Sequence, residues 1–395
     1  MMTHGTRTVL SNSLTILVAL LLCIPLITLF FDPLSSEVTN IPETVLGERR
    51  VPLLFDSVLF STGTTLFGLI IAIPAASLLV DIPGRFGAFS RLLAVSPIAV
   101  PSYLQALAWQ QLFESMDLPI QRTATAFCVE TFTRLPLLVA AVLIGLSIIS
   151  PLSRDAASLH ANPAKSLFSI SLPQARAAII AGSCITFIFS INEYALPALF
   201  QRHTYALEVF AEYSVSGSSG NTFVIALPLL ILSLICAVLT INAVRYLPSQ
   251  FYIPDTRASA LRGPALYDTL RLTALFIVFC QLLVPLGKTV SIMGESQNIL
   301  TVSNHSSLTT SILTAVATTL VTLPLAWLLA ERLNQHKDKI LWIVLAFGIA
   351  LPTSLIGVST IKFGQWTGVE LFYSGWGLAI LGMTLQLLPL STLII

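Results

Sequence analysis

Two pairs of polar side chains lie inside apolar stretches of this chain, and their types and spacing could support chemistry. Glu130 and Arg134 are four residues apart, and Asn192 and Glu193 are adjacent. Ionisable groups inside hydrophobic segments are costly, so they are usually functional or paired with one another. An i,i+4 ion pair on one helix face is the interpretation that we favour for Glu130 and Arg134. Asn192 and Glu193 either line a gate for a cationic substrate or reach the aqueous interface.

The composition places these residues in a membrane protein. The chain is 55% hydrophobic and only 10% charged, with a mean hydropathy of +0.86. Soluble domains carry roughly 25% charged residues, so nineteen acids and twenty bases cannot solvate the surface of a 42.6 kDa globule. A nucleic-acid binder would need a clustered basic face, and the net charge is only +1. An integral protein in a lipid bilayer, with many spans, remains.

Ten apolar stretches approach the length of about 20 residues that a helix needs to cross a bilayer. Transmembrane strands would be about ten residues long with polar alternation, which these runs lack. The expected fold is therefore an all-α polytopic membrane protein with about ten transmembrane helices. The expected spans are about 13–31, 57–80, 92–111, 130–150, 177–200, 222–244, 270–287, 307–330, 340–361 and 376–395.

Basic residues in the loops predict that the N-terminus is cytoplasmic. With that orientation, thirteen Lys and Arg residues fall in cytoplasmic segments and six in outer segments, while Arg134 lies within the fourth span. This asymmetry agrees with the positive-inside rule. It places the segment 151–176 on the cytoplasmic side of the membrane.

The chain resembles itself at an offset near 250 residues. Three blocks recur in the same order, and each contains a proline inside an expected span. Spans two to four therefore correspond to spans eight to ten, and both copies begin in the same orientation. Such a parallel repeat predicts a translocation path between two halves; the alternative is that the prolines only kink helices for packing. The matching blocks are Ser57, Ser61, Thr64, Pro74 and Ala76 with Ser307, Ser311, Thr314, Pro324 and Ala326; Ile98–Pro101 with Ile349–Pro352; and Leu135–Leu137 with Leu388–Leu390.

The segment 151–176 predicts two short helices on the cytoplasmic face. Ser153 can cap the first, and Asn162-Pro163 breaks it because a residue before proline disfavours the helical region. The second can run from Pro163 to about Ser169, with proline in its first turn, until Leu172-Pro173 ends it. Phe168, Ile170 and Leu172 would form its apolar side. Such a helix–turn–helix suits docking into a groove on a partner protein.

The same segment resembles the EAA loop in the permease subunits of ATP-binding-cassette importers, which have the type I (MetI-like) fold. Asp155 stands where glutamate is usual, and His160 stands where the pattern has glycine. The likeness extends from about residue 50 to residue 395, and within the family the chain is most similar to the fused two-half permeases for ferric iron. Thiamine permeases share the fused arrangement. The matching residues are Asp155-Ala156-Ala157, Leu159, Asn162-Pro163 and Ile170-Ser171-Leu172-Pro173.

The resemblance implies a set of partners. In that family the loop is a coupling helix, which inserts into a dimeric ATP-binding subunit and transmits its closure to the spans. Asp155 would be the acidic anchor near the helix N-terminus, where the dipole favours it, or only a solvated cap. The five histidines are not at metal-ligand spacing, so iron would be captured by a separate periplasmic binding protein. The implied location is the bacterial inner membrane, with Glu130, Arg134, Asn192 and Glu193 as candidates for the path.

No catalytic residue, cofactor or resident metal is expected. Gly287-Lys288-Thr289 imitates the end of a P-loop, but Leu282 replaces the first glycine and the triplet follows a membrane span. ATP hydrolysis is therefore assigned to a partner subunit. An ion-coupled secondary transporter is the alternative class, which is expected to bury carboxylates near the midplane and to contain broken helices. A channel would show charge rings or a filter signature, and neither is visible.

The repeat divides the chain into an expected complete half and an expected incomplete half. Pro136 precedes Asp155 by 19 residues and pairs with Pro389, so a second docking loop is expected near residue 408. Since the chain stops at Ile395, we expect a truncation, or a second permease polypeptide that supplies the rest. The expected segments are 1–50 with the first span; 51–245, the first transmembrane domain; 246–306, a linker, the seventh span and an outer loop; and 307–395, the truncated second transmembrane domain.

Overall fold

The computed structural model describes the chain in segments, and every regular element within them is a helix. Contacts divide the chain into two compact units, which we name the repeat-1 unit and the repeat-2 unit. The repeat-1 unit comprises Phe55–Thr204 and Leu239–Gln297, and the repeat-2 unit comprises Met1–Leu54, Tyr205–Val238 and Asn298–Ile395. The described residues are 47–116, 122–150, 162–247, 264–295, 302–336, 339–368 and 376–395, with the single positions Ile27 and Ser153.

Seven single helices in the described residues are long and apolar enough to cross a membrane, and two bent helix pairs raise the number of spans to at most nine. This confirms the expected all-helical fold with many helices that could span a membrane. The first expected span, 13–31, lies outside the described residues apart from Ile27. The single helices are α3 (Arg50–Asp81), α6 (Arg122–Ser147), a continuous run from Pro163 to Ile191, α12 (Ser219–Arg245), α13 (Ala265–Glu295), α14 (Val302–His336) and α18 (Trp376–Ile394).

Several serine and threonine side chains in these helices donate their hydroxyl groups to a carbonyl oxygen of their own helix. Thr65, Thr131 and Thr314 each donate to the carbonyl oxygen four residues earlier, over 2.8 Å. This i−4 bonding hides a polar group that would otherwise be exposed in an apolar medium. It allows a helix as rich in threonine as α14 to be compatible with the bilayer.

The third and ninth expected spans are bent rather than straight. The third consists of α4 (Gly84–Val95), η1 (Ser96–Ala99) and α5 (Ser102–Ser115), and its two halves meet at 98°. The ninth consists of α15 (Lys339–Ala350) and α16 (Thr353–Thr367), which meet at 102°. In each pair the break falls at the residue before a proline, where the helical region is sterically disfavoured. Pro101 and Pro352 have extended ψ angles of 134° and 138° and precede the second helix of each pair.

The same order of elements recurs in both units, which supports the predicted repeat. The breaks at Pro101 and Pro352 are separated by the predicted offset of 251 residues. Each bent pair follows a long helix with an internal proline, Pro74 in α3 and Pro324 in α14. Each also precedes a second proline-containing helix, α6 with Pro136 and α18 with Pro389. Equivalent prolines therefore bend the backbone in the same way twice.

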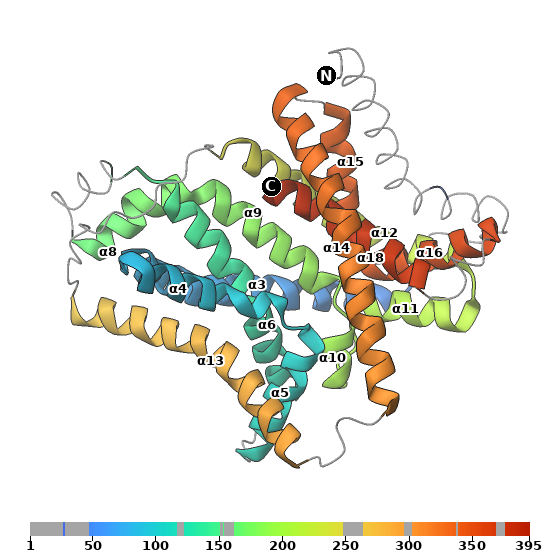
Figure 1. Cartoon of the computed structure of the whole chain (residues 1–395), viewed down its shortest axis with the longest axis horizontal. Coiled ribbons are helices and arrows are strands. Elements are labelled where there is room, and N and C mark those ends of the chain that lie inside the picture. Colours follow the sequence, from blue (N-terminus) through green and yellow to red (C-terminus); the bar gives the residue numbers. More distant parts are fainter. Residues whose placement is uncertain are drawn as a thin grey trace. The chain divides into compact units, whose positions relative to one another are not determined.

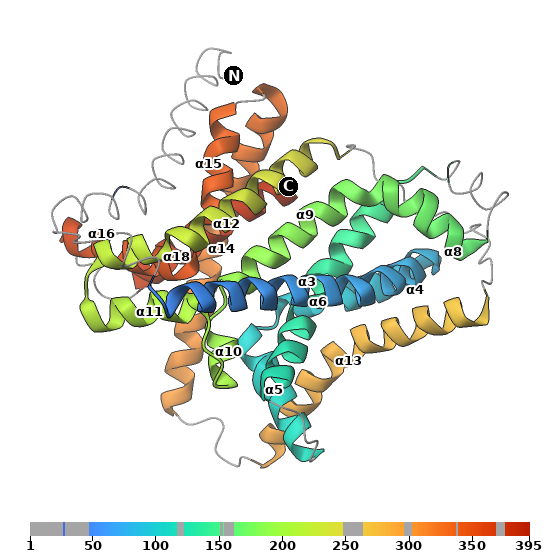
Figure 2. The ribbon, with the colours of Figure 1, turned by 180° about the vertical axis from the view of Figure 1, so that it is seen from behind.

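In the repeat-1 unit, α6 packs along α9 (Leu172–Ile191) through small residues (Figures 1 and 2). A Cβ atom at Gly182 would lie 2.1 Å from the Cβ of Ala141. One turn further along α6, a Cβ at Gly145 would lie 2.9 Å from the Cβ of Ala175. Small residues at such spacing let two membrane helices approach closely, because there is no side chain to hold the backbones apart.

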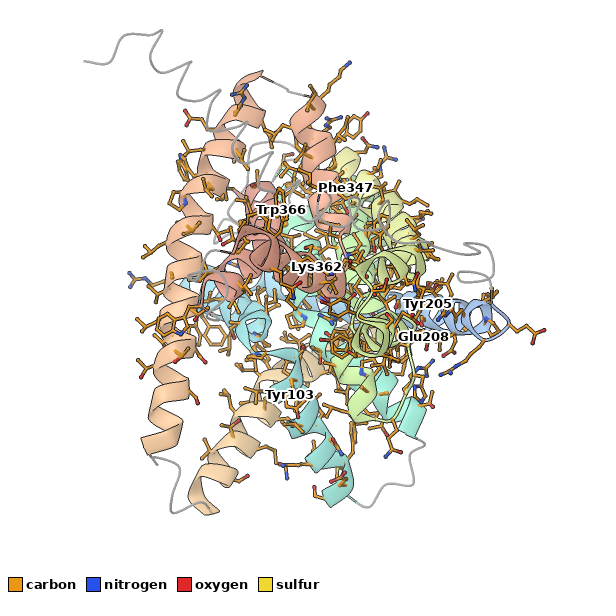
Figure 3. All side chains as sticks on the ribbon, turned by 90° about the vertical axis from the view of Figure 1, so that its right-hand side faces the viewer. Tyr103, Tyr205, Glu208, Phe347, Lys362 and Trp366 are labelled. Carbon is orange, nitrogen blue, oxygen red and sulfur yellow. The ribbon has the colours of Figure 1, made fainter. Side chains whose placement is uncertain are left out.

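In the repeat-2 unit, ion pairs attach α11 (Tyr205–Ser216) to the start of α3. The Arg50 guanidinium lies 3.4 Å from Glu208 and 3.1 Å from Glu212. Figure 3 shows Tyr205 and Glu208 together on α11. The Tyr205 hydroxyl donates to the carbonyl oxygen of Ile225 over 2.9 Å, and burial raises the pKa of this phenol. These contacts hold an amphipathic helix against the end of a span.

Candidate functional site: a buried ion cluster and a docking segment

Arg134 lies between two carboxylates inside the repeat-1 unit, and we name Glu130, Arg134 and Glu193 the ion cluster. Its Nε atom is 2.9 Å from Glu130 Oε1, which confirms the predicted i,i+4 pair on α6. Its Nη2 atom is 2.7 Å from Glu193 Oε2, at the far end of α9. The structure thus adds a partner to the predicted pair and bridges two helices through one guanidinium.

The end of α9 places Glu193 for this contact. The helix ends with Asn192 as its C-cap, so the fifth expected span ends at Ile191 and not near residue 200. The second oxygen of Glu193 accepts from the backbone N–H groups of Ala195 (3.0 Å) and Leu196 (3.4 Å), which open α10 (Ala195–Leu199). One carboxylate therefore caps α10 and binds Arg134 at the same time.

Asn192 and Glu193 differ in what their side chains contact. The Asn192 amide Nδ2 donates to the carbonyl oxygen of Ile188 in its own helix, over 2.9 Å. The side chain of Asn192 is buried and that of Glu193 is largely buried, so neither extends into solvent within its unit. Of the four candidate path residues, Glu130, Arg134 and Glu193 form one cluster, and their role in a path stays a prediction.

The ion cluster carries one more acid than base. Glu130 is fully buried and Arg134 is 13% exposed. The guanidinium also lies 5.9 Å from the centroid of the Phe189 ring, in cation–π range. Removing one partner from such a buried group leaves an uncompensated charge in a medium of low dielectric constant, which is strongly destabilising. Arg134 therefore ties α6 to the end of α9.

The second half of the predicted docking region starts as the sequence indicates. The side chain of Asn162 accepts from the Ala164 N–H over 3.4 Å, and Pro163 is the first residue of α8 (Pro163–Ser166). An Asn cap followed by proline suits a helix start, because the missing N–H of proline is one that the helix would not use. We name residues 162–173 the docking segment.

The prediction that Leu172-Pro173 ends this helix is wrong. The chain continues from α8 through η2 (Leu167–Ser171), a single π-helical turn, into α9. The Leu172 N–H bonds to the carbonyl oxygen of Leu167, five residues earlier. A wider turn accommodates a residue such as Pro173 that has no N–H to donate. The docking segment and the fifth span are therefore one continuous helix.

Side chains of the docking segment divide into an anchored set and an exposed one. Leu167 is buried in the core formed with α3 and α6, and Leu172 packs against the same core. Ile170 is half-buried. Phe168 is 62% exposed and points away from this core. The apolar side is thus split, with leucines holding the segment to the unit and Phe168 presented outward.

The first half of the predicted docking region lies mainly outside the described residues. Ser150 accepts from the Ser153 N–H over 3.3 Å, and Ser153 is itself helical. Ser153 therefore lies within a helical turn and does not precede it as a cap. Outside the described residues are Asp155, Ala156, Ala157, Leu159 and His160.

Comparison with known proteins leaves the family open. The chain matches no protein-family model, and it matches no curated protein. Within the described residues, no group of three His, Cys, Asp or Glu side chains is arranged to hold a metal ion.

Proposed function

We propose that this chain is the permease subunit of an ATP-binding-cassette importer in a bacterial inner membrane, with its N-terminus in the cytoplasm. The observation that carries the proposal is the docking segment, a capped helix with an outward Phe168 that continues directly into a candidate span. The match of the EAA pattern to residues 155–173 supports the same assignment. A dimeric ATPase subunit would bind this segment, and a periplasmic binding protein would deliver the substrate.

The continuous helix supplies a physical means of coupling. A helix rises about 1.5 Å per residue, so α9 spans about 30 Å from the docking segment to the ion cluster. A displacement applied at Phe168 is carried along a rigid element to Glu193, which is bonded to Arg134. ATP-driven closure of the partner subunit would thus change the contact between α6 and the end of α9. That contact is then the place where nucleotide state acts on the path.

The proposed cargo is ferric iron, because the likeness is strongest to the fused two-half iron permeases. Thiamine or another small solute is the alternative within the same family. The docking segment is shared by importers of many substrates, so cargo is tested separately. Uptake of radiolabelled ferric iron and of thiamine, measured in a deletion strain with and without the gene, distinguishes the two.

The docking assignment predicts a specific cross-link. Phe168 replaced by p-benzoylphenylalanine in the full chain, in native membranes, is expected to cross-link to a P-loop ATPase on irradiation. Phe168→Ala is expected to weaken docking by about 2 kcal/mol, the loss typical of a buried aromatic anchor at an interface. The matched control is Phe55, which is 70% exposed and lies near the N-terminus of α3. The docking segment packs against the C-terminal part of that helix. No ATPase adduct at 168, or an equal yield at 55, contradicts the proposal.

An ion-coupled secondary transporter is the second candidate, and two observations favour it. Two spans are bent by 98° and 102°, and two carboxylates are buried beside Arg134; both features are found in secondary transporters. The energy source separates the classes. Uptake abolished by vanadate and insensitive to a protonophore supports the importer, and the reverse pattern supports the secondary transporter.

A further inference from the structure

An apolar groove runs between α4 and α13 in the repeat-1 unit. Its volume is about 290 Å³. The lining side chains include Phe86, Phe89 and Leu93 from α4 and Leu275, Phe279 and Leu283 from α13. Phe86 is 71% exposed, so the groove opens on the surface of the unit. Figure 1 shows α13 beginning on the same side of the unit as α8 and running below α4.

The groove offers a ligand almost no hydrogen-bonding group. Its one polar side chain is Ser90, whose hydroxyl donates to the carbonyl oxygen of Phe86 over 2.9 Å. A polar solute placed there would lose its hydration without compensation. A hydrocarbon chain loses nothing and gains contact with aromatic and leucine side chains. The chemistry of the groove therefore selects an aliphatic ligand.

One end of the groove is basic. The Arg271–Asp81 ion pair joins α13 to the end of α3, beside the start of α4. The charged residues of α3, α4 and α13 at this end are three bases and two acids: Arg85, Arg91 and Arg271 against Asp81 and Asp268. A basic site between membrane helices attracts the headgroups of anionic lipids.

Arg85 is the base at this end that is available to a ligand. Arg91 donates to the carbonyl oxygens of Leu79 and Ile82 at the end of α3, and Arg271 is paired with Asp81. Arg85 is exposed, and the described residues offer it no hydrogen-bond or ion-pair partner. It stands in the first turn of α4, next to the lining residue Phe86 and one turn before the lining residue Phe89.

We propose that this groove binds an anionic phospholipid, with one acyl chain between α4 and α13 and the phosphate beside Arg85. The inference requires only that the chain spans a membrane, and it is independent of the proposed transport function. It makes α4 and α13 the boundary at which a lipid of defined charge is held against the protein.

Native mass spectrometry of the full chain tests this proposal. Protein is released from nanodiscs that contain equal amounts of phosphatidylglycerol and phosphatidylethanolamine, and the retained lipid is weighed. Arg85→Gln is expected to reduce retained phosphatidylglycerol about fivefold, the attraction of one surface arginine for an anionic leaflet. The control Arg176→Gln removes an exposed base from α9 and is expected to change retention little. Equal retention in wild type and Arg85→Gln, or an equal loss in Arg176→Gln, overturns the proposal.

A second pair of variants tests whether an acyl chain occupies the groove. Leu283→Trp narrows the groove from its exposed rim and is expected to reduce retention of both lipids. Leu286→Trp enlarges an exposed side chain on the same helix outside the groove and is expected to leave retention unchanged. Soluble glycerol phosphate is expected not to displace the lipid. Displacement by glycerol phosphate, or an equal effect of the two tryptophans, shows that no acyl chain occupies the groove.

Discussion

Arg134→Gln is expected to lower the free energy of unfolding by about 3–5 kcal/mol, the cost of breaking a buried ion pair on one side. The substitution leaves Glu130 and Glu193 as neighbouring carboxylates without a cation, in a region where Glu130 is fully buried. Stabilities of folded proteins are about 5–15 kcal/mol, so this loss is a large fraction of the total. Unfolding by sodium dodecyl sulfate in mixed micelles, followed by circular dichroism, measures it.

The control for this prediction is a variant in which all three side chains of the ion cluster are neutral. The triple variant Glu130→Gln, Arg134→Gln and Glu193→Gln removes all three charges and keeps side chains of similar size. We expect it to recover most of the loss, because replacement of a whole buried ionic group by neutral groups is often near neutral. Arg134→Lys keeps the positive charge but lacks the planar guanidinium. Its free energy of unfolding is expected to lie between those of Arg134→Gln and the wild type. An Arg134→Gln protein that unfolds like wild type would show that the ion cluster contributes nothing to stability.

Gly182→Leu is expected to prevent α9 from packing on α6. Even the first carbon of a side chain at this position would lie 2.1 Å from the Cβ of Ala141, far inside van der Waals contact. Overpacking a close interface costs about 1–3 kcal/mol when the structure can shift. We expect that range for Gly182→Ala and loss of the folded protein for Gly182→Leu, measured by size-exclusion chromatography of the detergent-solubilised chain and by the same unfolding assay.

The matched control is another helical glycine in the same unit. A Cβ at Gly287 in α13 would meet no atom within 4 Å. Gly287→Ala is therefore expected to stabilise the protein by about 0.5–1 kcal/mol, because alanine loses less conformational freedom than glycine in a helix. The swap Ala141→Gly with Gly182→Ala is expected to restore part of the stability. If both glycine-to-alanine variants behave alike, close contact between α6 and α9 is not what limits packing.

Local patterns predicted those features that depend on nearby residues. The Glu130–Arg134 pair follows from helix geometry, since positions four apart share a face. The start of α8 at Pro163 likewise follows from the Asn162-Pro163 pair, and its Asn162 cap was not among the predictions. Local rules misjudged Pro173, because a π-helical turn just before it absorbs the missing hydrogen bond. They also gave 92–111 and 340–361 as single spans without the bends near 100°, since hydropathy measures apolar length and carries no information about direction.

Features formed by distant residues needed the folded chain. Glu193 is 59 residues from Arg134, and no pattern in the sequence links them. The nearest signal was the opposite charge in consecutive apolar stretches, which indicates a shared need for a partner but not which partner. The outward direction of Phe168 was also unpredictable, because it depends on Leu167 and Leu172 packing against α3 and α6.

Composition, run length and spacing alone establish that this chain belongs in a membrane, that it is helical and that its proline-containing blocks occur twice. These quantities are sums or periods over neighbouring residues, so they can be calculated from the sequence before any packing is known. Only the tertiary structure decided three other features. They are the bridging of two helices by Arg134, the two bends near 100° and the groove beside Arg85. The bridge through Arg134 depends on how closely α9 approaches α6, which small residues such as Ala141 and Gly182 control.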